Sequence, residues 1–182
     1  LVRYRLWERR FAADRLGEWR ATRSLRPVRA LRRGLNVQMR DGELAHLLET
    51  LEARRPCSLL VFGMGNDSVL WCEANRGGQT LFVEDDPYWE AVIRQRHPSI
   101  QSQRVVYGTR AAEWRADLAR PTPLFLPRTV TGQAWDMVLV DGPAAYTDDS
   151  PGRVQSVLAA RRVLAPGGSL LVHDCDRRPE RA

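Results

Sequence analysis

Short apolar runs alternate with stretches of helical spacing along most of this chain. Runs typical of buried strands are expected near residues 58–62, 80–84, 103–107, 135–141 and 169–174. Helical spacing, bounded by capping residues, Gly or Pro, predicts helices after Asp67 and Ser68 and over 87–97, 111–118 and 153–164. Strands that alternate with helices imply parallel crossovers. The pattern therefore predicts an α/β fold with a parallel sheet in the order 3-2-1-4-5 and helices on both faces.

The first 55 residues have a different pattern. Tyr4, Trp7, Phe11, Leu16 and Trp19 fall roughly on one helical stripe with Arg elsewhere, and Pro27 and Gly34 are expected to interrupt the helix. A further amphipathic helix is expected over 43–54, and Pro56 leads the chain into the first strand. We therefore predict an Arg-rich helical segment, 1–55, and an α/β domain, 56–182.

Composition changes the picture mainly through charge. All 28 basic residues of the 182 are Arg, and 11 of them lie in residues 1–33 against three acids. Residues 34–182 are therefore nearly neutral. The basic helix is open to two interpretations, a solvated face or a surface for an anionic polymer or membrane. The three cysteines lack the spacing of a zinc site, and no run of eighteen apolar residues is present.

The stretch from the first to the second strand has the features of a nucleoside-binding unit. Gly63-Met64-Gly65 follows the first strand, and Glu84 ends the second about twenty residues later. Glycines let a ligand approach the backbone, and a carboxylate at the next strand tip can accept hydrogen bonds from ribose hydroxyls. Ser68 stands where the dinucleotide pattern has its third glycine. This favours S-adenosylmethionine, which has no pyrophosphate, over NAD.

Several short blocks together resemble the glucuronoxylan 4-O-methyltransferase family of plant xylan biosynthesis. They are Pro56-Cys57, Leu60 to Ser68, Asn75 to Gly78, Phe82 to Asp86, Trp135-Asp136, Val140 to Pro143, Tyr146, Pro151 to Arg153 and Val172 to Arg177. The resemblance implies a Rossmann-like S-adenosylmethionine-dependent methyltransferase fold. It also implies methyl transfer to O4 of a glucuronic acid branch on xylan, in the Golgi. Such folds continue beyond a fifth strand, so we expect further strands after residue 182.

The resemblance also implies roles for the cofactor side of the site. Gly63, Gly65 and Asp67 are expected to line the methionine and ribose, and Glu84 is expected to hold the ribose hydroxyls, with Asp85 as the alternative. Tyr107 and Thr109 lie where the adenine ring is expected.

Methylation of a sugar hydroxyl requires removal of its proton, and two mechanisms are open. His173 and Asp141, at the tips of neighbouring central strands with Asp174 beside them, are candidates for the base. Alternatively, Asp141, Asp174 and Asp176 offer oxygen ligands for Mg²⁺ or Mn²⁺, as in catechol-type O-methyltransferases.

An acidic polysaccharide or oligosaccharide is the expected acceptor. Arg153 is predicted to pair with a uronate carboxylate, with Arg177 in reserve and Tyr146 nearby. Two other functions stay open: a non-catalytic family member that assists polysaccharide assembly, and a nucleic-acid methyltransferase that uses the Arg-rich segment. The second is disfavoured because the aromatic residues do not alternate with Arg and no base-flipping signature follows the fourth strand. A membrane contact is expected only through an anchor that precedes Leu1.

Overall fold

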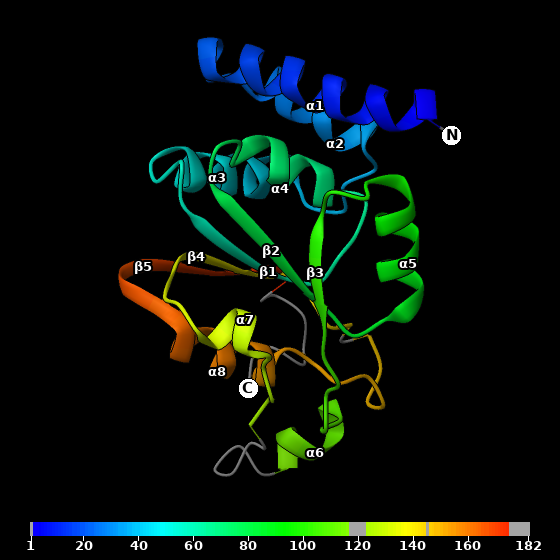
Figure 1. Cartoon of the computed structure of the whole chain (residues 1–182), viewed down its shortest axis with the longest axis vertical. Helices are drawn as coiled ribbons and strands as arrows, with labels where there is room; N and C mark the ends of the chain where they lie inside the picture. The colour runs from blue at the N-terminus through cyan, green and yellow to red at the C-terminus, as the bar shows by residue number, and fades with distance from the viewer. Residues whose placement is uncertain (1, 117–122, 145, 175–182) are drawn as a thin grey trace.

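A five-stranded parallel sheet forms the centre of the molecule (Figure 1). The structure, a computed structural model, describes residues 2–116, 123–144 and 146–174. The strands are β1 (Ser58–Phe62), β2 (Gln79–Glu84), β3 (Gln101–Arg104), β4 (Trp135–Val140) and β5 (Leu164–Val172). Their order is β3-β2-β1-β4-β5, and every neighbouring pair is parallel. The predicted fold class and strand order are confirmed.

Alternating side chains of the central strands build a separate hydrophobic core on each face. Leu59 and Val61 of β1 belong to one core, and Leu60 and Phe62 belong to the other. All four are almost fully buried. Parallel strands covered on both faces have such continuous apolar runs, which is why β1 was recognisable from the sequence.

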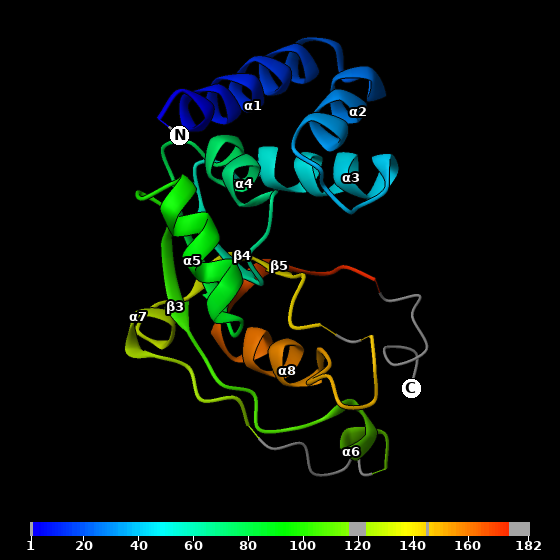
Figure 2. The ribbon, with the colours of Figure 1, turned by 90° about the vertical axis from the view of Figure 1, so that its right-hand side faces the viewer.

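Helices cover the two faces unequally (Figures 1 and 2). One face carries α3 (Asp41–Glu52), α4 (Ser68–Ala74) and α5 (Pro87–Arg96), and α1 (Val2–Thr22) and α2 (Leu25–Gly34) form a further layer over α3 and α4. The other face carries α7 (Arg128–Thr131) and α8 (Val154–Val163), while α6 (Ala111–Ala116) lies at the end of the molecule remote from α1. Among the described helices, none has both the length and the apolar character needed to cross a bilayer.

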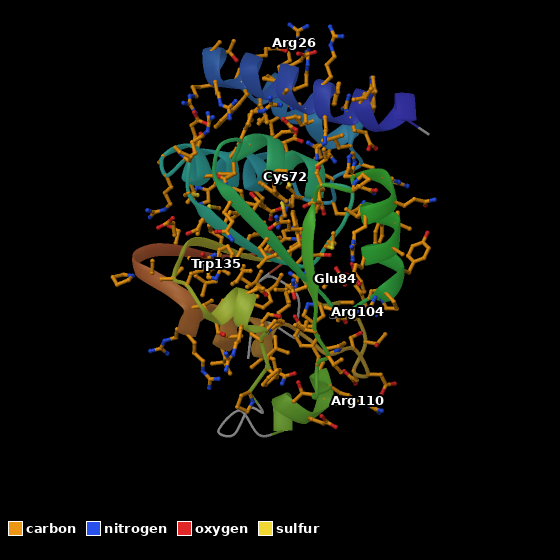
Figure 3. All side chains as sticks on the ribbon, viewed as in Figure 1. Arg26, Cys72, Glu84, Arg104, Arg110 and Trp135 are labelled. Atoms are coloured by element: carbon orange, nitrogen blue, oxygen red, sulfur yellow. The ribbon has the colours of Figure 1, made fainter. Side chains whose placement is uncertain are left out.

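The hydrophobic core on the α3 face continues into the N-terminal helices. Leu16 and Trp19 of α1 and Leu31 of α2 are buried in the same cluster as Leu59 of β1. Arg26, in contrast, points outward from this layer (Figure 3). The basic segment thus has one face in the core and another in solvent, and its division from the α/β domain at residue 55 stays a prediction.

The third strand lies earlier in the sequence than predicted. The polar residues Gln101–Arg104 form β3, which ends where Arg104 pairs with Glu84, the last residue of β2; the Val105 N–H still donates to the Glu84 carbonyl, 3.0 Å away. The fifth strand begins at Leu164 rather than at residue 169. Residues 165–168, which lie between the predicted helix and the predicted strand, form an irregularity within β5, opposite Trp135 and Met137 of β4.

Two other local predictions are corrected. Pro27 does not break a helix, because it lies in the first turn of α2, where the missing N–H needs no partner. The stretch 119–134, which the sequence pattern leaves without a predicted helix or strand, contains the single turn α7 among its described residues. The side-chain N–H of Trp135 donates to the Val130 carbonyl of this turn, 2.8 Å away, and so fixes it beside β4.

Candidate functional site

A cleft of about 560 Å³ opens at the carboxyl ends of β1, β2, β4 and β5. Its walls come from the loops after these strands and from residues 36–38, which precede α3. We call it the rim cleft. Predicted site residues that line it are Gly63, Gly65, Asp67, Glu84, Asp85, Asp141, Tyr146, Arg153, His173 and Asp174. Parallel strands end at one edge of a sheet, so residues distant in sequence converge there.

The floor of the rim cleft is formed where the ends of β1 and β4 touch backbone to backbone. Gly63 has a φ of +103°, and a Cβ there would lie 2.9 Å from the Gly142 nitrogen. A Cβ on Gly142 would lie 2.8 Å from the Gly63 Cα. The Asp141 N–H donates to the Phe62 carbonyl across the same junction, 2.8 Å away. Only glycine fits at both positions, because the facing backbone fills the space that a side chain would occupy.

Glu84, labelled in Figure 3, is the last residue of β2. Its carboxylate accepts hydrogen bonds from the backbone N–H groups of Met64, Asp85 and Asp86. Burial nevertheless raises the pKa of Glu84 to about 7, against these hydrogen bonds, and it also raises the pKa of Asp85. Glu84 therefore ties the glycine loop to the tip of β2 and carries a charge that the protein does not fully balance.

Asp67 is the second acid whose charge is poorly balanced. Its carboxylate accepts a hydrogen bond of 2.8 Å from the Trp71 indole. Burial, followed by the nearby charge of Asp141, raises the pKa of Asp67 to about 6. The cleft thus collects carboxylates on its β1 and β2 side, where a cation or a hydroxyl donor would relieve their repulsion.

His173 and Asp141 form a closely hydrogen-bonded pair on the β4 and β5 side. Nδ1 of His173 lies 2.7 Å from an oxygen of Asp141 and 3.3 Å from one of Asp174. Burial lowers the pKa of His173, but the hydrogen bond and charge of Asp141 and the charge of Asp174 outweigh it, so the net pKa is raised. Because Nδ1–H donates to the carboxylate in the neutral imidazole, Nε2 keeps its lone pair and can accept a proton.

Arg153 is a buried residue that connects the ends of β4 and β5. It is 4% exposed, and its guanidinium donates to the backbone carbonyls of His173 and Asp141, the latter at 2.9 Å. It also lies 3.3 Å from the carboxylate of Asp174. The binding of a substrate carboxylate by Arg153 stays a prediction, and these internal contacts give it a role in positioning the pair.

The same three residues could also bind a metal. A nitrogen of His173 and one oxygen each of Asp141 and Asp174 lie within 4.8 Å of one another. Nitrogen and carboxylate donors suit several divalent ions. Asp176, the third ligand predicted from the sequence, lies outside the described residues, as does Arg177.

Comparison with known sequences assigns the chain to a protein family. The model of the IRX15/IRX15L/GXM family matches residues 42–122 and 124–182, which include the strands and most of the rim cleft. The chain belongs to the IRX15/IRX15L/GXM family. The predicted resemblance is confirmed.

Curated relatives in Arabidopsis thaliana carry different names. Glucuronoxylan 4-O-methyltransferase 3 is 33% identical over 168 residues, covering 79% of this chain and 56% of the relative. Arabinogalactan O-methyltransferase 2 is 30% identical over 167 residues, covering 77% and 57%. Protein IRX15-LIKE is 34% identical over 175 residues, covering 80% and 55%. The chain spans a little over half the length of these relatives.

Tyr107 and Thr109, which were predicted to bind the cofactor, are not among the described residues that line the rim cleft. The Tyr107 hydroxyl is 2.7 Å from the Ser156 hydroxyl, and the Thr109 hydroxyl donates to Gln155 at 2.8 Å, both on α8. Their contact with an adenine ring stays a prediction. Tyr146 lines the cleft but is 75% exposed.

Sequence reasoning missed the contribution of the N-terminal segment. Residues 36–38 line the rim cleft, and a Glu43 oxygen of α3 lies 3.7 Å from Nε2 of His173. No motif marks these residues, because 36–38 lie in the link between α2 and α3 and Glu43 is one of several polar residues on α3. The position of residues 36–38 and Glu43 beside the cleft depends on how the N-terminal helices pack against the sheet.

Proposed function

We propose that this chain forms the S-adenosylmethionine-binding and catalytic part of an O-methyltransferase that acts on a glucuronic acid branch of xylan or a related acidic polysaccharide. The observation that carries the proposal is the pairing, in one cleft, of unbalanced carboxylates with a hydrogen-bonded His173–Asp141 pair. The names of several relatives, among them glucuronoxylan 4-O-methyltransferase 3, support it. Golgi location, implied by the same resemblance, stays a prediction.

The charge of the cleft fits S-adenosylmethionine better than NAD. Burial raises the pKa values of Asp67, Glu84 and Asp85 in spite of their hydrogen bonds, so the protein compensates their negative charge only in part. A sulfonium, an ammonium and a ribose diol would supply cationic charge and hydroxyl donors, whereas a pyrophosphate would add to the repulsion. Gly63, Gly65, Asp67 and Glu84 are the residues that we expect to hold the cofactor.

The reaction needs a proton acceptor at the oxygen that is methylated. Held by Gly63, Gly65, Asp67 and Glu84, S-adenosylmethionine would supply an electrophilic methyl group to the acceptor oxygen and would leave as a neutral thioether. His173 accepts the hydroxyl proton at Nε2, and Asp141 orients the ring and stabilises the imidazolium that results. Arg153 is a positioning residue, since it bonds to the backbone carbonyls of both members of the pair.

A divalent ion at Asp141, His173 and Asp174 is the alternative to base catalysis by His173. The donor set fits such an ion, which would acidify the acceptor hydroxyl. The two mechanisms compete for the same atoms, because the His173 nitrogen bonded to Asp141 would have to face the ion instead. Methyl transfer that survives treatment with EDTA would favour the base mechanism.

Parallel calorimetric titrations with S-adenosylmethionine and NAD test the proposal. We expect binding of S-adenosylmethionine only, and we expect Glu84→Ala to weaken it by about 1–3 kcal/mol through loss of a charged acceptor. Thr50→Ala, on α3 outside the rim cleft, is the control. A chain that binds neither cofactor would instead be a non-catalytic family member, and binding of NAD alone would indicate a dehydrogenase.

A further inference from the structure

A second, smaller cavity of about 290 Å³ adjoins the rim cleft. It lies between the N-terminal half of α3 and the end of β5, which Figure 2 shows on the same side of the molecule. We call it the α3–β5 pocket, and its lining residues include Arg40, Glu43, His46, Leu47 and Leu171. His173 and Asp174 line both cavities, so the two spaces meet at the proposed base.

The two ring nitrogens of His173 face different cavities. Nδ1 bonds to Asp141, which lines the rim cleft and is absent from the described lining of the α3–β5 pocket. Nε2 lies 3.7 Å from the carboxylate of Glu43, which lines the α3–β5 pocket. The nitrogen that is free to take a proton therefore faces the smaller cavity, whereas the unbalanced carboxylates of Asp67 and Glu84 line the larger one.

We propose that the α3–β5 pocket binds the acceptor as a single uronosyl ring, with its carboxylate toward Arg40 and His46 and its reacting hydroxyl toward His173. This inference rests on the proposed function, and it assigns the acceptor to residues that precede the α/β domain. The volume lies near the lower end of the range for small-molecule sites, about 300–1,000 Å³, which suits one ring better than a chain of them.

The chemistry of the pocket walls matches this ring. Leu47, Leu171 and Val172 give an apolar surface for the C–H face of a sugar. The side chain of Arg40, which ends in a guanidinium, is 72% exposed, and His46 is exposed on α3, six residues further along the chain. A planar guanidinium pairs well with a carboxylate, and Arg40 can reach solvent and ligand in a way that the buried Arg153 cannot.

Glu43 keeps Arg40 in place beside the pocket. Its carboxylate accepts from the Arg40 backbone N–H at 2.9 Å and lies 2.8 Å from the Arg40 guanidinium. Burial raises the pKa of Glu43, but the hydrogen bonds and charge of Arg40 prevail and lower it, so Glu43 is ionised at neutral pH. A substrate carboxylate at Arg40 would thus be kept apart from Nε2 of His173 by a fixed negative charge, which favours a hydroxyl at that nitrogen.

Steady-state kinetics on the full chain can test the assignment. The acceptors are a xylo-oligosaccharide with a glucuronosyl branch and the same oligosaccharide with its carboxyl group reduced. We expect Arg40→Ala and His46→Gln each to raise the KM for the acidic acceptor about tenfold, with kcat and the Kd of S-adenosylmethionine little changed. The KM for the reduced acceptor should stay the same. Arg33→Ala, exposed on α2 outside both cavities, is the matched control.

The outcomes separate this inference from the function on which it rests. An unchanged KM for the acidic acceptor in both variants, or an equal rise for both acceptors, would overturn the pocket assignment while the methyltransferase stands. A wild-type chain that binds no S-adenosylmethionine and methylates neither acceptor would overturn the proposed function itself. Circular dichroism spectra that match wild type would show that a raised KM does not come from loss of α3.

Discussion

The N-terminal helices α1 to α3, here called the helical layer, and the rim cleft differ in how the charges of their carboxyl groups are compensated. In the layer, Arg29 and Arg32 pair with Asp41, and the hydrogen bond from Arg32 leads the interactions that lower its pKa. In the cleft, burial raises the pKa of Asp67 and of Glu84. Carboxyl groups in the first region are stabilised by the protein itself, whereas those in the second lack sufficient compensation. Raised values in a cleft are typical of sites that await a ligand.

Removal of a large buried side chain from the helical layer should have the largest effect. Trp19 is 1% exposed and packs in the core shared with the sheet, so Trp19→Ala should lower the free energy of unfolding by about 3–5 kcal/mol. Urea denaturation followed by circular dichroism measures this. Leu6→Ala, 65% exposed on the same helix, should change it by about 0.5 kcal/mol or less. Similar values for the two variants would mean that α1 is not part of the core.

Arg153→Lys should have an intermediate effect, because it disturbs the rim without creating a large cavity. A Lys keeps the charge but has no planar fork to reach the Asp141 and His173 carbonyls from two nitrogens. We expect a loss of about 1–3 kcal/mol in the free energy of unfolding, the cost of an unpaired buried polar group. Arg161→Lys, exposed on α8, is the control. If Arg153→Lys left the stability unchanged but raised the KM for a uronate acceptor, the result would support the prediction that Arg153 binds the substrate carboxylate.

The smallest expected effect is the pH dependence of cofactor affinity. A cation binds to an ionised carboxylate, and Asp67, with a pKa of about 6, is ionised at pH 8 and largely protonated at pH 5. Affinity for S-adenosylmethionine should therefore fall as pH falls. Protonation of one group with a pKa of about 6 lowers the affinity at pH 5 about tenfold relative to pH 8.

Calorimetric titrations between pH 5 and pH 8 would measure this dependence. Asp67→Asn should weaken binding at pH 8 and flatten the profile. A wild-type affinity that is constant with pH would show that the cleft carboxylates do not contact the cationic part of the ligand, and the contrast with the helical layer would lose its functional meaning.

The sequence predicted the parts of the fold that depend on local pattern. The strands β1, β2 and β4 were recognisable as apolar runs, and each ends at a glycine or an acid that lines the rim cleft. The polar edge strand β3 was misplaced because its pairing with β2, rather than its composition, decides where it lies. In the same way residues 165–168, which precede the predicted strand, are part of β5, since pairing with β4 extends across them.

The site was predictable only where it is made of strand tips. Glu84, Asp141 and His173 follow apolar runs directly, and the sheet topology alone brings them to one edge. Glu43 gave no such signal, because its position beside His173 arises from the packing of α3 on the sheet. The internal partners of Arg153 were equally hidden, since a buried Arg and a surface Arg look alike in a sequence.

The contact between Gly63 and Gly142 limits how this chain can change over evolutionary time. At most positions a larger residue can be accommodated later by a smaller neighbour. Here each added Cβ would meet backbone atoms of the facing strand end, so neither glycine can be rescued by a substitution at the other. Both codons are therefore constrained, and no pair of substitutions at the two positions can compensate for each other. Variation between related chains should instead appear in the loops around the contact.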